Sequence, residues 1–374
     1  MGQRILVTGG AGFVGSHLVE ELVRQHYTVR VVDALVPQVH GRTRKPKYLP
    51  KGVEFIQADV RRPQTWQRAL KGIRVIFHQA AEVGVGQSMY EITKYMEANT
   101  IGTAVMWQEL ITGRYPAQKV IVASSMSIYG EGQYRCRAHG VVYPALRAEA
   151  QLKRRDWEMR CPRCHVPVAG EPTPEEKPLM PTSVYAISKR DQEELSLSIG
   201  RAYKIPAVAL RYFNIYGPRQ SLSNPYTGVA AIFSSRLRSG KSPVVFEDGG
   251  QSRDFIHVHD IVRANLLVMK RREADYEMFN VGTGHATSVV RLAELLAEYL
   301  ETPIRPTVVG KFRAGDIRHC FADASKIRRR LGFEAKVRFE DGLGDLVRWV
   351  QEEVDVVDRV DRATKELAAR GLVK

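Results

Sequence analysis

Three glycines near the start of the chain, Gly9, Gly12 and Gly15, constrain the fold more than any other feature. Residues 3–8 precede them as a predicted buried strand, and residues 16–24 follow with helical periodicity. In this setting the first glycine allows a tight turn, the second lets a pyrophosphate approach the backbone, and the third packs the helix on the strand. The helix N-terminus then faces the phosphates. We therefore expect a dinucleotide-binding unit.

A second predicted strand, residues 27–33, ends in Asp33, about 20 residues beyond the glycines. An acid at this place can hold a ribose 2′-hydroxyl and repels a 2′-phosphate, so it favours NAD over NADP. The alternative is a plain glycine turn with a structural aspartate.

Other expected cofactor contacts lie in the glycine turn, at strand ends and in a helix predicted at about 90–112. They are Phe13, Val14, Asp59, Val60, Gln79, Ala80, Ala81, Asn99, Ser124 and Tyr212. Two of them have an alternative reading: Asp59 could cap the next helix, and Asn99 could be a buried anchor or exposed.

Strand and helix patterns alternate along most of the chain. Further strands are predicted at residues 53–57, 74–78, 119–124, 207–213 and 279–282. Such alternation predicts an α/β fold with a doubly wound, Rossmann-type parallel sheet and right-handed crossovers. We expect residues 1–214 to form this domain. Residues 215–374 should form a smaller C-terminal α/β cap that binds substrate and interleaves with the sheet near 253–283.

Tyr185 and Lys189 stand four residues apart in a predicted helix, so both side chains emerge from one face. A nearby ammonium favours the phenolate and lowers the tyrosine pKa. The pair can then take a proton from an alcohol or return one to a carbonyl. Ser125 or Ser127, at the end of strand 119–124, could hydrogen-bond the same oxygen. The alternatives are a chance spacing on an amphipathic helix and serines that satisfy their own backbone.

Taken together, these motifs resemble the extended short-chain dehydrogenase/reductase family, and within it the nucleotide-sugar epimerase/dehydratase branch. The motifs that carry the resemblance occur in order: Gly9/Gly12/Gly15, Asp33, 124–130, Tyr185/Lys189, 211–219, 253–258 and 313–316. They span most of the chain.

The resemblance implies a role for each matched position. Tyr185 would be the catalytic base and acid, Lys189 would bind the nicotinamide ribose, and Ser125 would share the hydrogen bond to the reacting hydroxyl. Residues expected to contact the substrate, a nucleotide-diphosphate sugar, are Ser125, Met126, Ser127, Asn214, Arg219, Arg253, Arg313 and Asp316. Arginine suits this role because its planar fork matches phosphate oxygens.

The resemblance also sorts the reaction types. The related 4,6-dehydratases carry an acid pair where this chain has Met126 and Ser127, and the decarboxylases place a glutamate at the position of Ser127. What remains is 4-epimerisation with NAD, and the expected substrate is a dTDP-6-deoxyhexose such as dTDP-L-rhamnose. The alternatives are a UDP-glucose or UDP-glucuronate 4-epimerase, a 4-ketosugar reductase, and a cofactor-binding regulator or nucleic-acid binder.

An insertion at about 131–175 separates Ser125 from Tyr185 by more than the family pattern requires. It carries Cys136, His139, Cys161 and Cys164, which together offer the four ligands of a tetrahedral structural zinc site. His165 is a possible substitute for His139. The rival readings are a disulfide, disfavoured in a reducing cytoplasm, and free thiols.

Composition is that of an ordinary globular protein, with 44% hydrophobic and 26% charged residues. A net charge of +15 suits nucleic acid, a membrane surface or acidic small molecules. Two of the three basic clusters fall late in helical patterns, which favours solvated helix ends over a nucleic-acid surface. No apolar run approaches the roughly 18–20 residues of a membrane span. The first predicted strand, residues 3–8, begins almost at the N-terminus. We expect a cytoplasmic enzyme without a nucleic-acid or membrane partner, and by resemblance a homodimer.

Overall fold

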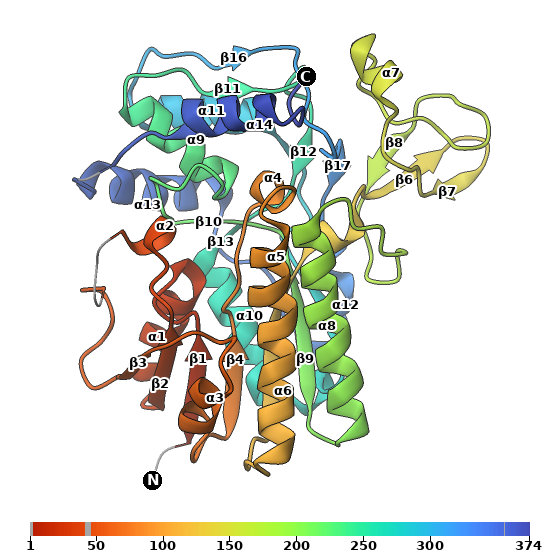
Figure 1. Ribbon diagram of the computed structural model, residues 1–374. Helices are drawn as coiled ribbons and strands as arrows, with labels where there is room; N and C mark the ends of the chain where they lie inside the picture. The colour runs from red at the N-terminus through yellow and green to blue at the C-terminus, as the bar shows by residue number, and fades with distance from the viewer. Residues whose placement is uncertain (1–2, 42–45, 355) are drawn as a thin grey trace.

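The computed structural model describes residues 3–41, 46–354 and 356–374. A seven-stranded parallel sheet with strand order β14-β9-β5-β4-β1-β2-β3 forms its centre (Figure 1). The strands are β1 (Arg4–Thr8), β2 (Thr28–Asp33), β3 (Glu54–Gln57), β4 (Val75–His78), β5 (Lys119–Ser125), β9 (Ala207–Tyr212) and β14 (Met278–Val281). The predicted doubly wound sheet is confirmed, and each predicted strand differs from the observed one by no more than one residue at either end.

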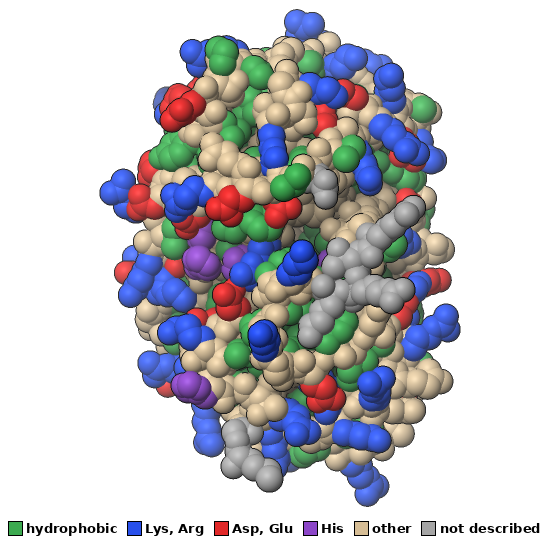
Figure 2. Space-filling model, turned by 90° about the vertical axis from the view of Figure 1, so that its left-hand side faces the viewer, with side chains coloured by type: hydrophobic (Ala, Val, Ile, Leu, Met, Phe, Trp, Pro, Cys, Tyr) green, Lys and Arg blue, Asp and Glu red, His purple; other side chains and the backbone are tan. Residues whose placement is uncertain are grey.

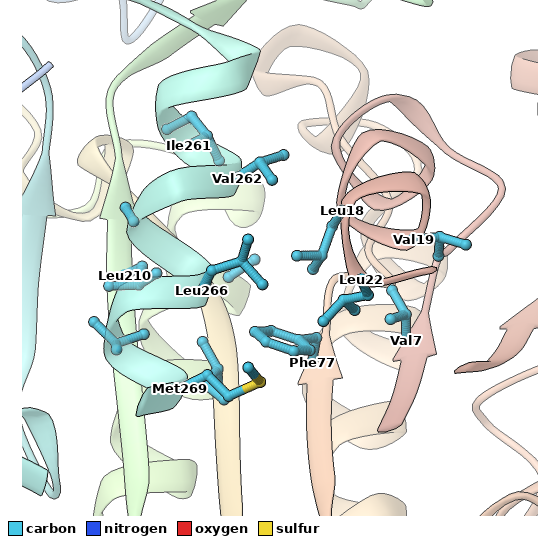
Figure 3. Packing of buried hydrophobic residues seen from close by; sticks show 14 of the residues in the cluster. Val7, Leu18, Val19, Leu22, Phe77, Leu210, Ile261, Val262, Leu266 and Met269 are labelled. Carbon is cyan, nitrogen blue, oxygen red and sulfur yellow. The ribbon is translucent and has the colours of Figure 1, made fainter. Parts of the chain in front are cut away.

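Helices cover both faces of this sheet because successive strand side chains point to opposite sides. On one face pack α1 (Phe13–Arg24), α10 (Val258–Lys270) and α12 (Ser325–Leu331). On the other pack α3 (Pro63–Ala69), α6 (Gly102–Thr112) and α8 (Val184–Ala202). Figure 3 shows the first layer, where Leu22 of α1 and Leu266 of α10 approach each other over Phe77 of β4.

The helix predicted at about 90–112 is continuous but not uniform. It runs through α5 (Ile92–Tyr95), a π-helical turn (Met96–Ile101) and α6. π-Turns inside α-helices are uncommon and occur often at functional sites. Three short helical segments complete the first half: α2 (Pro37–His40), α4 (Val85–Ser88) and a 3₁₀ turn (Met126–Tyr129).

A second apolar cluster forms the cap above the sheet (Figure 1). Its helices are α9 (Val229–Arg238), α11 (Val289–Tyr299), α13 (Phe339–Glu352) and α14 (Val360–Ala369). Short strands join cap and sheet in two pairs and one three-stranded sheet. The pairs are β10 (Asn214–Tyr216) with β13 (Phe255–His257) and β11 (Val244–Val245) with β16 (Thr307–Val308). In the three-stranded sheet, β12 (Ser252–Arg253) lies between β15 (Thr287–Ser288) and β17 (His319–Cys320). A 3₁₀ turn (Arg272–Ala274) precedes β14. Between 258 and 281 the chain therefore returns to the sheet before it re-enters the cap.

The cysteine-bearing segment projects from the body beside the cap (Figure 1). It contains β6 (Gln133–Cys136), β7 (Gly140–Val142), α7 (Glu149–Lys153) and β8 (Ala169–Glu171). The strands form a small antiparallel sheet in the order β7-β6-β8. Its own apolar cluster is small: Tyr134, Cys136, Val142, Met159, Cys161 and Val168.

The surface in Figure 2 carries lysines and arginines over its whole extent, with acidic side chains among them. They do not gather into one basic patch on this face. Within the described ranges, no helix combines the length and apolarity needed to span a bilayer.

Candidate active site

A cleft of about 1570 Å³ lies between the carboxyl ends of the sheet strands and the cap. Ligands of doubly wound folds bind in this crevice, outside the strand ends. Nearly all residues predicted to bind cofactor or substrate line it: Gly9, Gly12, Phe13, Val14, Asp33, Asp59, Val60, Gln79, Ala80, Ala81, Ser124, Ser125, Met126, Ser127, Tyr185, Lys189, Tyr212, Asn214, Arg219, Arg253, Arg313 and Asp316.

The glycine turn leaves a cradle at the N-terminus of α1. Gly9 has φ +65°, and its carbonyl accepts a hydrogen bond from the Gly12 amide at 3.0 Å. A Cβ on Gly15 would lie 2.1 Å from the Gly9 oxygen, so the helix can approach the turn only with glycine there. No side chain caps the first turn of α1. Its free amides therefore suit a phosphate, as the sequence predicts.

Asp33 at the end of β2 sits beside this cradle. One carboxylate oxygen accepts the Ala11 amide at 2.9 Å, and the other accepts the Leu35 amide at 2.9 Å. The aspartate thus braces the turn and also lines the cleft. Its contact with a ribose stays a prediction.

Asn99 is a buried anchor. Its side-chain oxygen accepts the Glu82 amide at 2.8 Å, and its nitrogen donates to the Glu82 carbonyl at 3.0 Å and to Ser188 Oγ at 2.9 Å. The side chain is fully buried in the π-turn and is absent from the cleft wall described above. Asn99 therefore holds the loop at Glu82, and its contact with the cofactor stays a prediction.

Ser125, Tyr185 and Lys189 meet where β5 ends against α8, as predicted. Tyr185 is hydrogen-bonded to Ser125. Burial raises the pKa of the Tyr185 hydroxyl, and this hydrogen bond lowers it in part. Ser125 also accepts the Ser127 amide at 3.2 Å and the Ser127 hydroxyl at 2.9 Å. Ser125 therefore caps the 3₁₀ turn Met126–Tyr129 that follows its strand, and it faces the tyrosine as well.

The effect of Lys189 on the tyrosine stays a prediction. Burial lowers the pKa of the Lys189 ammonium to about 7, while Glu193 opposes this shift. Its Nζ donates to Gln192 Oε1 at 2.7 Å. The ammonium is therefore about half charged at pH 7.

Gln192 and Glu193 are buried neighbours of the site that sequence reasoning missed. Glu193 accepts a hydrogen bond from Ser124 Oγ at 2.6 Å and forms a buried ion pair with Arg211 at 2.5 Å. The side chain of Ser124 is thereby tied to this pair. The sequence could have indicated these neighbours, since Gln192 and Glu193 lie three and four positions after Lys189 and side chains at these spacings are adjacent on a helix.

Three charged residues from two parts of the cap, one at the end of β12 and two in the loop before β17, converge on the other end of the cleft. Asp316 accepts hydrogen bonds from Arg313 Nε at 3.0 Å and Nη2 at 2.8 Å, and from Arg253 Nη2 at 3.5 Å. Burial raises the pKa of the Asp316 carboxyl, but the two arginines outweigh it and hold the pKa below its ordinary value. The group that the sequence predicted to hold a diphosphate is thus assembled.

Five cleft-lining residues carry a buried polar atom without a hydrogen-bond partner among the described residues: Asn214, Arg219, Gln220, Gln251 and Trp349. Two of these atoms, Asn214 Oδ1 and Arg219 Nη1, belong to residues predicted to bind the substrate. The other terminal nitrogen of Arg219 donates to Glu20 at 2.7 Å, and the guanidinium lies over the Tyr48 ring at 5.1 Å. Buried polar groups are rarely left unsatisfied, so these atoms suit a ligand.

The four predicted metal ligands also meet. Their donor atoms lie within 4.8 Å of one another. Cys136 Sγ is 3.7 Å from Cys164 Sγ, and His139 Nδ1 is 3.5 Å from Cys136 Sγ and 3.4 Å from Cys161 Sγ. No disulfide joins the cysteines of the described chain. His165, the suggested substitute, is exposed and outside the group.

These distances fit one zinc ion. Zinc binds sulfur at about 2.3 Å and nitrogen at about 2.0–2.1 Å, which in a tetrahedron separates sulfur pairs by about 3.8 Å and sulfur–nitrogen pairs by about 3.6 Å. The three distances in the structure lie close to these values. The donor set, three thiols and one imidazole, is also one that structural zinc sites use.

Fold and site together define a Rossmann-type enzyme of the short-chain dehydrogenase/reductase class, with a serine, a tyrosine and a lysine at its cleft. The chain belongs to the NAD dependent epimerase/dehydratase family, whose sequence pattern matches residues 5–144 and 162–282. It is an enzyme of the nucleotide-sugar epimerase kind.

Individual relatives agree with this family. The chain is 35% identical to the dTDP-L-rhamnose 4-epimerase of Burkholderia thailandensis, over 95% of this chain and 96% of that protein. Among solved structures it is similar to Thermotoga maritima UDP-glucose 4-epimerase with UDP-glucose (TM-score 0.76, 32% identity, 94% of this chain and 99% of that one). It is also similar to Thermus thermophilus UDP-glucose 4-epimerase complexed with NAD (TM-score 0.74, 29% identity, 94% and 100%).

Proposed function

We propose that the protein catalyses the NAD-dependent 4-epimerisation of a nucleotide-diphosphate sugar. The observation that carries this proposal is the hydrogen-bonded pair of Ser125 and Tyr185 in the cleft, with Lys189 on the same helix face. Met126 and Ser127 stand where a dehydratase would need acids, so the acid pair for the loss of water is missing at these two positions.

NAD would be held by the amides at the start of α1, by Asp33 and by the strand-end residues that line the cleft. When bound, it supplies the hydride acceptor for an alcohol and the hydride donor for a ketone. Val60, Gln79 and Ala80 line the same cleft and would add contacts, and Lys189 would bind the second ribose.

The chain's own contribution is to move one proton and to hold the sugar. Tyr185 takes the proton of the C4 hydroxyl and returns it after the sugar has presented its other face. Ser125 hydrogen-bonds the same oxygen and keeps it beside the tyrosine. Because the sugar is oxidised and then reduced at one carbon, the net redox change is zero.

Arg253 and Arg313 are the proposed diphosphate ligands, and Asn214 and Arg219 offer the unpartnered polar atoms described above. For the sugar we favour a dTDP-6-deoxyhexose such as dTDP-L-rhamnose, since a relative that acts on it shares 35% identity. UDP-glucose and UDP-glucuronate are the alternatives, supported by similar structures that contain these ligands. A 4-ketosugar reductase on the same scaffold is the second candidate function.

Three further features belong to the proposal. Zinc is proposed as a structural ion held by Cys136, His139, Cys161 and Cys164, on the distances given above. A homodimer is the proposed assembly, and the cytoplasm the proposed compartment.

The test is to purify the protein without added cofactor and to incubate it with dTDP-L-rhamnose, UDP-glucose and UDP-glucuronate separately. NMR would follow the coupling of the sugar H4 while absorbance at 340 nm is recorded. We expect one C4 epimer to form without a build-up of NADH. Conversion only with added NAD(P)H would establish a reductase instead, and no conversion of any sugar would refute these substrates.

A further inference from the structure

The cysteine insertion (residues 131–175) packs directly against the loop that carries Arg313, here called the arginine loop (residues 311–318). Leu152 and Trp157 of the insertion form a buried apolar cluster with Phe312 of that loop. Phe312 is adjacent in sequence to Arg313, which lines the cleft. The insertion therefore supports the backbone directly beside a proposed diphosphate ligand.

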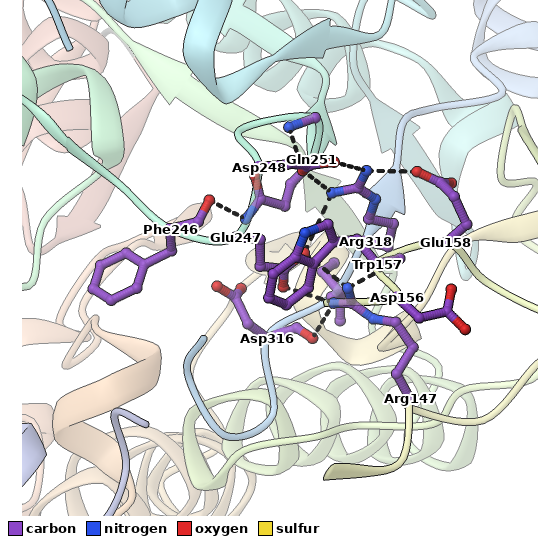
Figure 4. A network of polar contacts seen from close by, with 12 residues as sticks. Arg147, Asp156, Trp157, Glu158, Phe246, Glu247, Asp248, Gln251, Asp316 and Arg318 are labelled. Atoms are coloured by element: carbon purple, nitrogen blue, oxygen red, sulfur yellow. Dashed lines mark hydrogen bonds and ion pairs between the residues drawn. The ribbon is translucent and has the colours of Figure 1, made fainter. Parts of the chain in front are cut away.

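A buried arginine from the insertion adds a polar link (Figure 4). Arg147 donates to both carboxylate oxygens of Glu247, at 2.7 and 2.9 Å, and to the Asp316 carbonyl at 3.3 Å. It also donates to the Trp157 carbonyl at 2.9 Å. One guanidinium thus joins the insertion, the cap and the arginine loop. Arg147 and Glu247 are 8% and 1% exposed, so this charge-assisted contact is shielded from water.

The residues that make these contacts are close in sequence to the metal ligands. Glu158, three positions before Cys161, forms an ion pair with Arg318 at 2.5 Å. Tyr134, two positions before Cys136, accepts a hydrogen bond from the His319 amide at 3.1 Å. Both ligand-bearing segments therefore touch the arginine loop or the residue that follows it.

We propose that the metal centre positions the sugar-nucleotide site. By folding the insertion, it holds the arginine loop so that Arg313 and Asp316, and with them Arg253, face the diphosphate. This positioning role depends on the proposed function in one respect only, namely that the bound anion is a nucleoside diphosphate. The insertion needs a metal ion to hold its fold because its apolar cluster has only six buried members, two of them the ligands Cys136 and Cys161.

The first experiment varies the metal ligands in the full chain. Cys161→Ser and His139→Asn are compared with His165→Asn, a matched control at an exposed histidine of the same insertion. Zinc is measured by elemental analysis, and binding of UDP and dTDP by calorimetry. Both ligand variants should lose the zinc and bind these nucleotides about tenfold more weakly or worse, as loss of a supporting contact does at other sites. The control should keep both. A wild-type chain without metal, or unchanged nucleotide binding after metal loss, would overturn the proposal.

The second experiment leaves the metal ligands intact and so stands even if those variants fail to fold. Arg147→Met is compared with Arg154→Met, which changes an exposed arginine of the same insertion. Arg147→Met should keep its zinc and its NAD content. It should raise KM and the Kd of UDP or dTDP about tenfold while kcat stays within about twofold, which marks a loss of substrate positioning and not of chemistry. Wild-type binding in Arg147→Met would contradict the link.

Nucleotide binding requires no turnover, so the two proposals fail separately. Loss of binding in these variants together with no epimerisation of any sugar would refute the proposed function alone. Normal binding in the variants of an active epimerase would refute the positioning role alone.

Discussion

Proton transfer in the cleft depends on the groups around Tyr185. Burial raises the pKa of its hydroxyl, and Ser125 offers the hydrogen bond that opposes this shift. Lys189, with a pKa of about 7, is only partly charged at neutral pH. A cation bound beside the tyrosine would favour the phenolate of this proposed base further.

Tyr185→Phe should abolish epimerisation because the ring remains but the proton carrier is gone. We expect turnover to fall by about 10²–10⁴-fold, the usual contribution of a general acid–base. Bound NAD, measured after denaturation of the protein, should stay at the wild-type level. Tyr95→Phe is the matched control, since the Tyr95 ring contacts that of Tyr185 but lies outside the cleft wall. Turnover that survives in Tyr185→Phe would refute the assigned base.

Lys189→Met should stabilise the fold at low pH while it impairs activity. The pKa of Lys189 is about 7 in the folded chain and near 10.4 in an unfolded one. Between these values the unfolded chain binds a proton that the folded chain does not, so wild-type stability rises with pH. The advantage of the variant should therefore be largest below pH 7, on the order of a few kcal/mol, and disappear as pH rises towards 10.

Chemical denaturation at pH 6 and pH 9.5 would measure this difference. Lys51→Met, at an exposed lysine, should show no such trend. A gain in stability that is the same at both pH values would show that burial of the charged Lys189 ammonium does not destabilise the folded protein.

At the scale of helices and strands, the sheet was readable from the sequence because buried parallel strands are continuous apolar runs. Residues 119–124, for example, contain four apolar positions in a row, and the strand ends where predicted within one residue. The π-turn at 96–101 was not readable, since a helix with one widened turn keeps almost the same periodicity. The anchoring role of Asn99 was not readable either, because its partners Glu82 and Ser188 come from elsewhere in the chain.

Helix α13 offers a paired test of packing in the cap. A Cβ on Gly342 would lie 2.3 Å from the Tyr216 hydroxyl, whereas a Cβ on Gly344 would lie at least 3.6 Å from its neighbours. Gly342→Ala should destabilise the protein by about 1–3 kcal/mol through overpacking. Gly344→Ala should stabilise it by about 0.4–1 kcal/mol, because alanine restricts the unfolded chain. Thermal unfolding of the two variants would decide, and a gain in Gly342→Ala would mean that Tyr216 moves aside at little cost.

At the scale of the whole molecule, a net charge of +15 acts on every anionic ligand. Basic side chains are spread over the face in Figure 2, so anionic ligands are attracted by the net charge of the molecule more than by one basic patch. The net charge follows directly from the residue composition. The composition could not show that Arg253, Arg313 and Asp316 converge, since their grouping depends on how the cap folds over the sheet.

Ionic strength should therefore change substrate capture and not the chemical step. The screening length shrinks from about 30 Å at 0.01 M to about 8 Å at 0.15 M salt. Over this range kcat/KM should fall severalfold while kcat stays constant. Sucrose at equal osmolality is the control and should leave both unchanged. A kcat/KM that is independent of salt would show that the long-range field plays no part.

The spacing of the insertion's contacts also bears on the order in which the chain folds. The cysteine pair Cys136 and Cys164 closes a segment of 28 residues. The contacts that dock the insertion span far more chain: 100 residues for Arg147 with Glu247, and 160 for Glu158 with Arg318. Short closures form faster than long ones. With the proposed zinc bound, the insertion could be complete on a nascent chain before the arginine loop has been synthesised. It would then offer a preformed surface against which the last quarter of the protein folds.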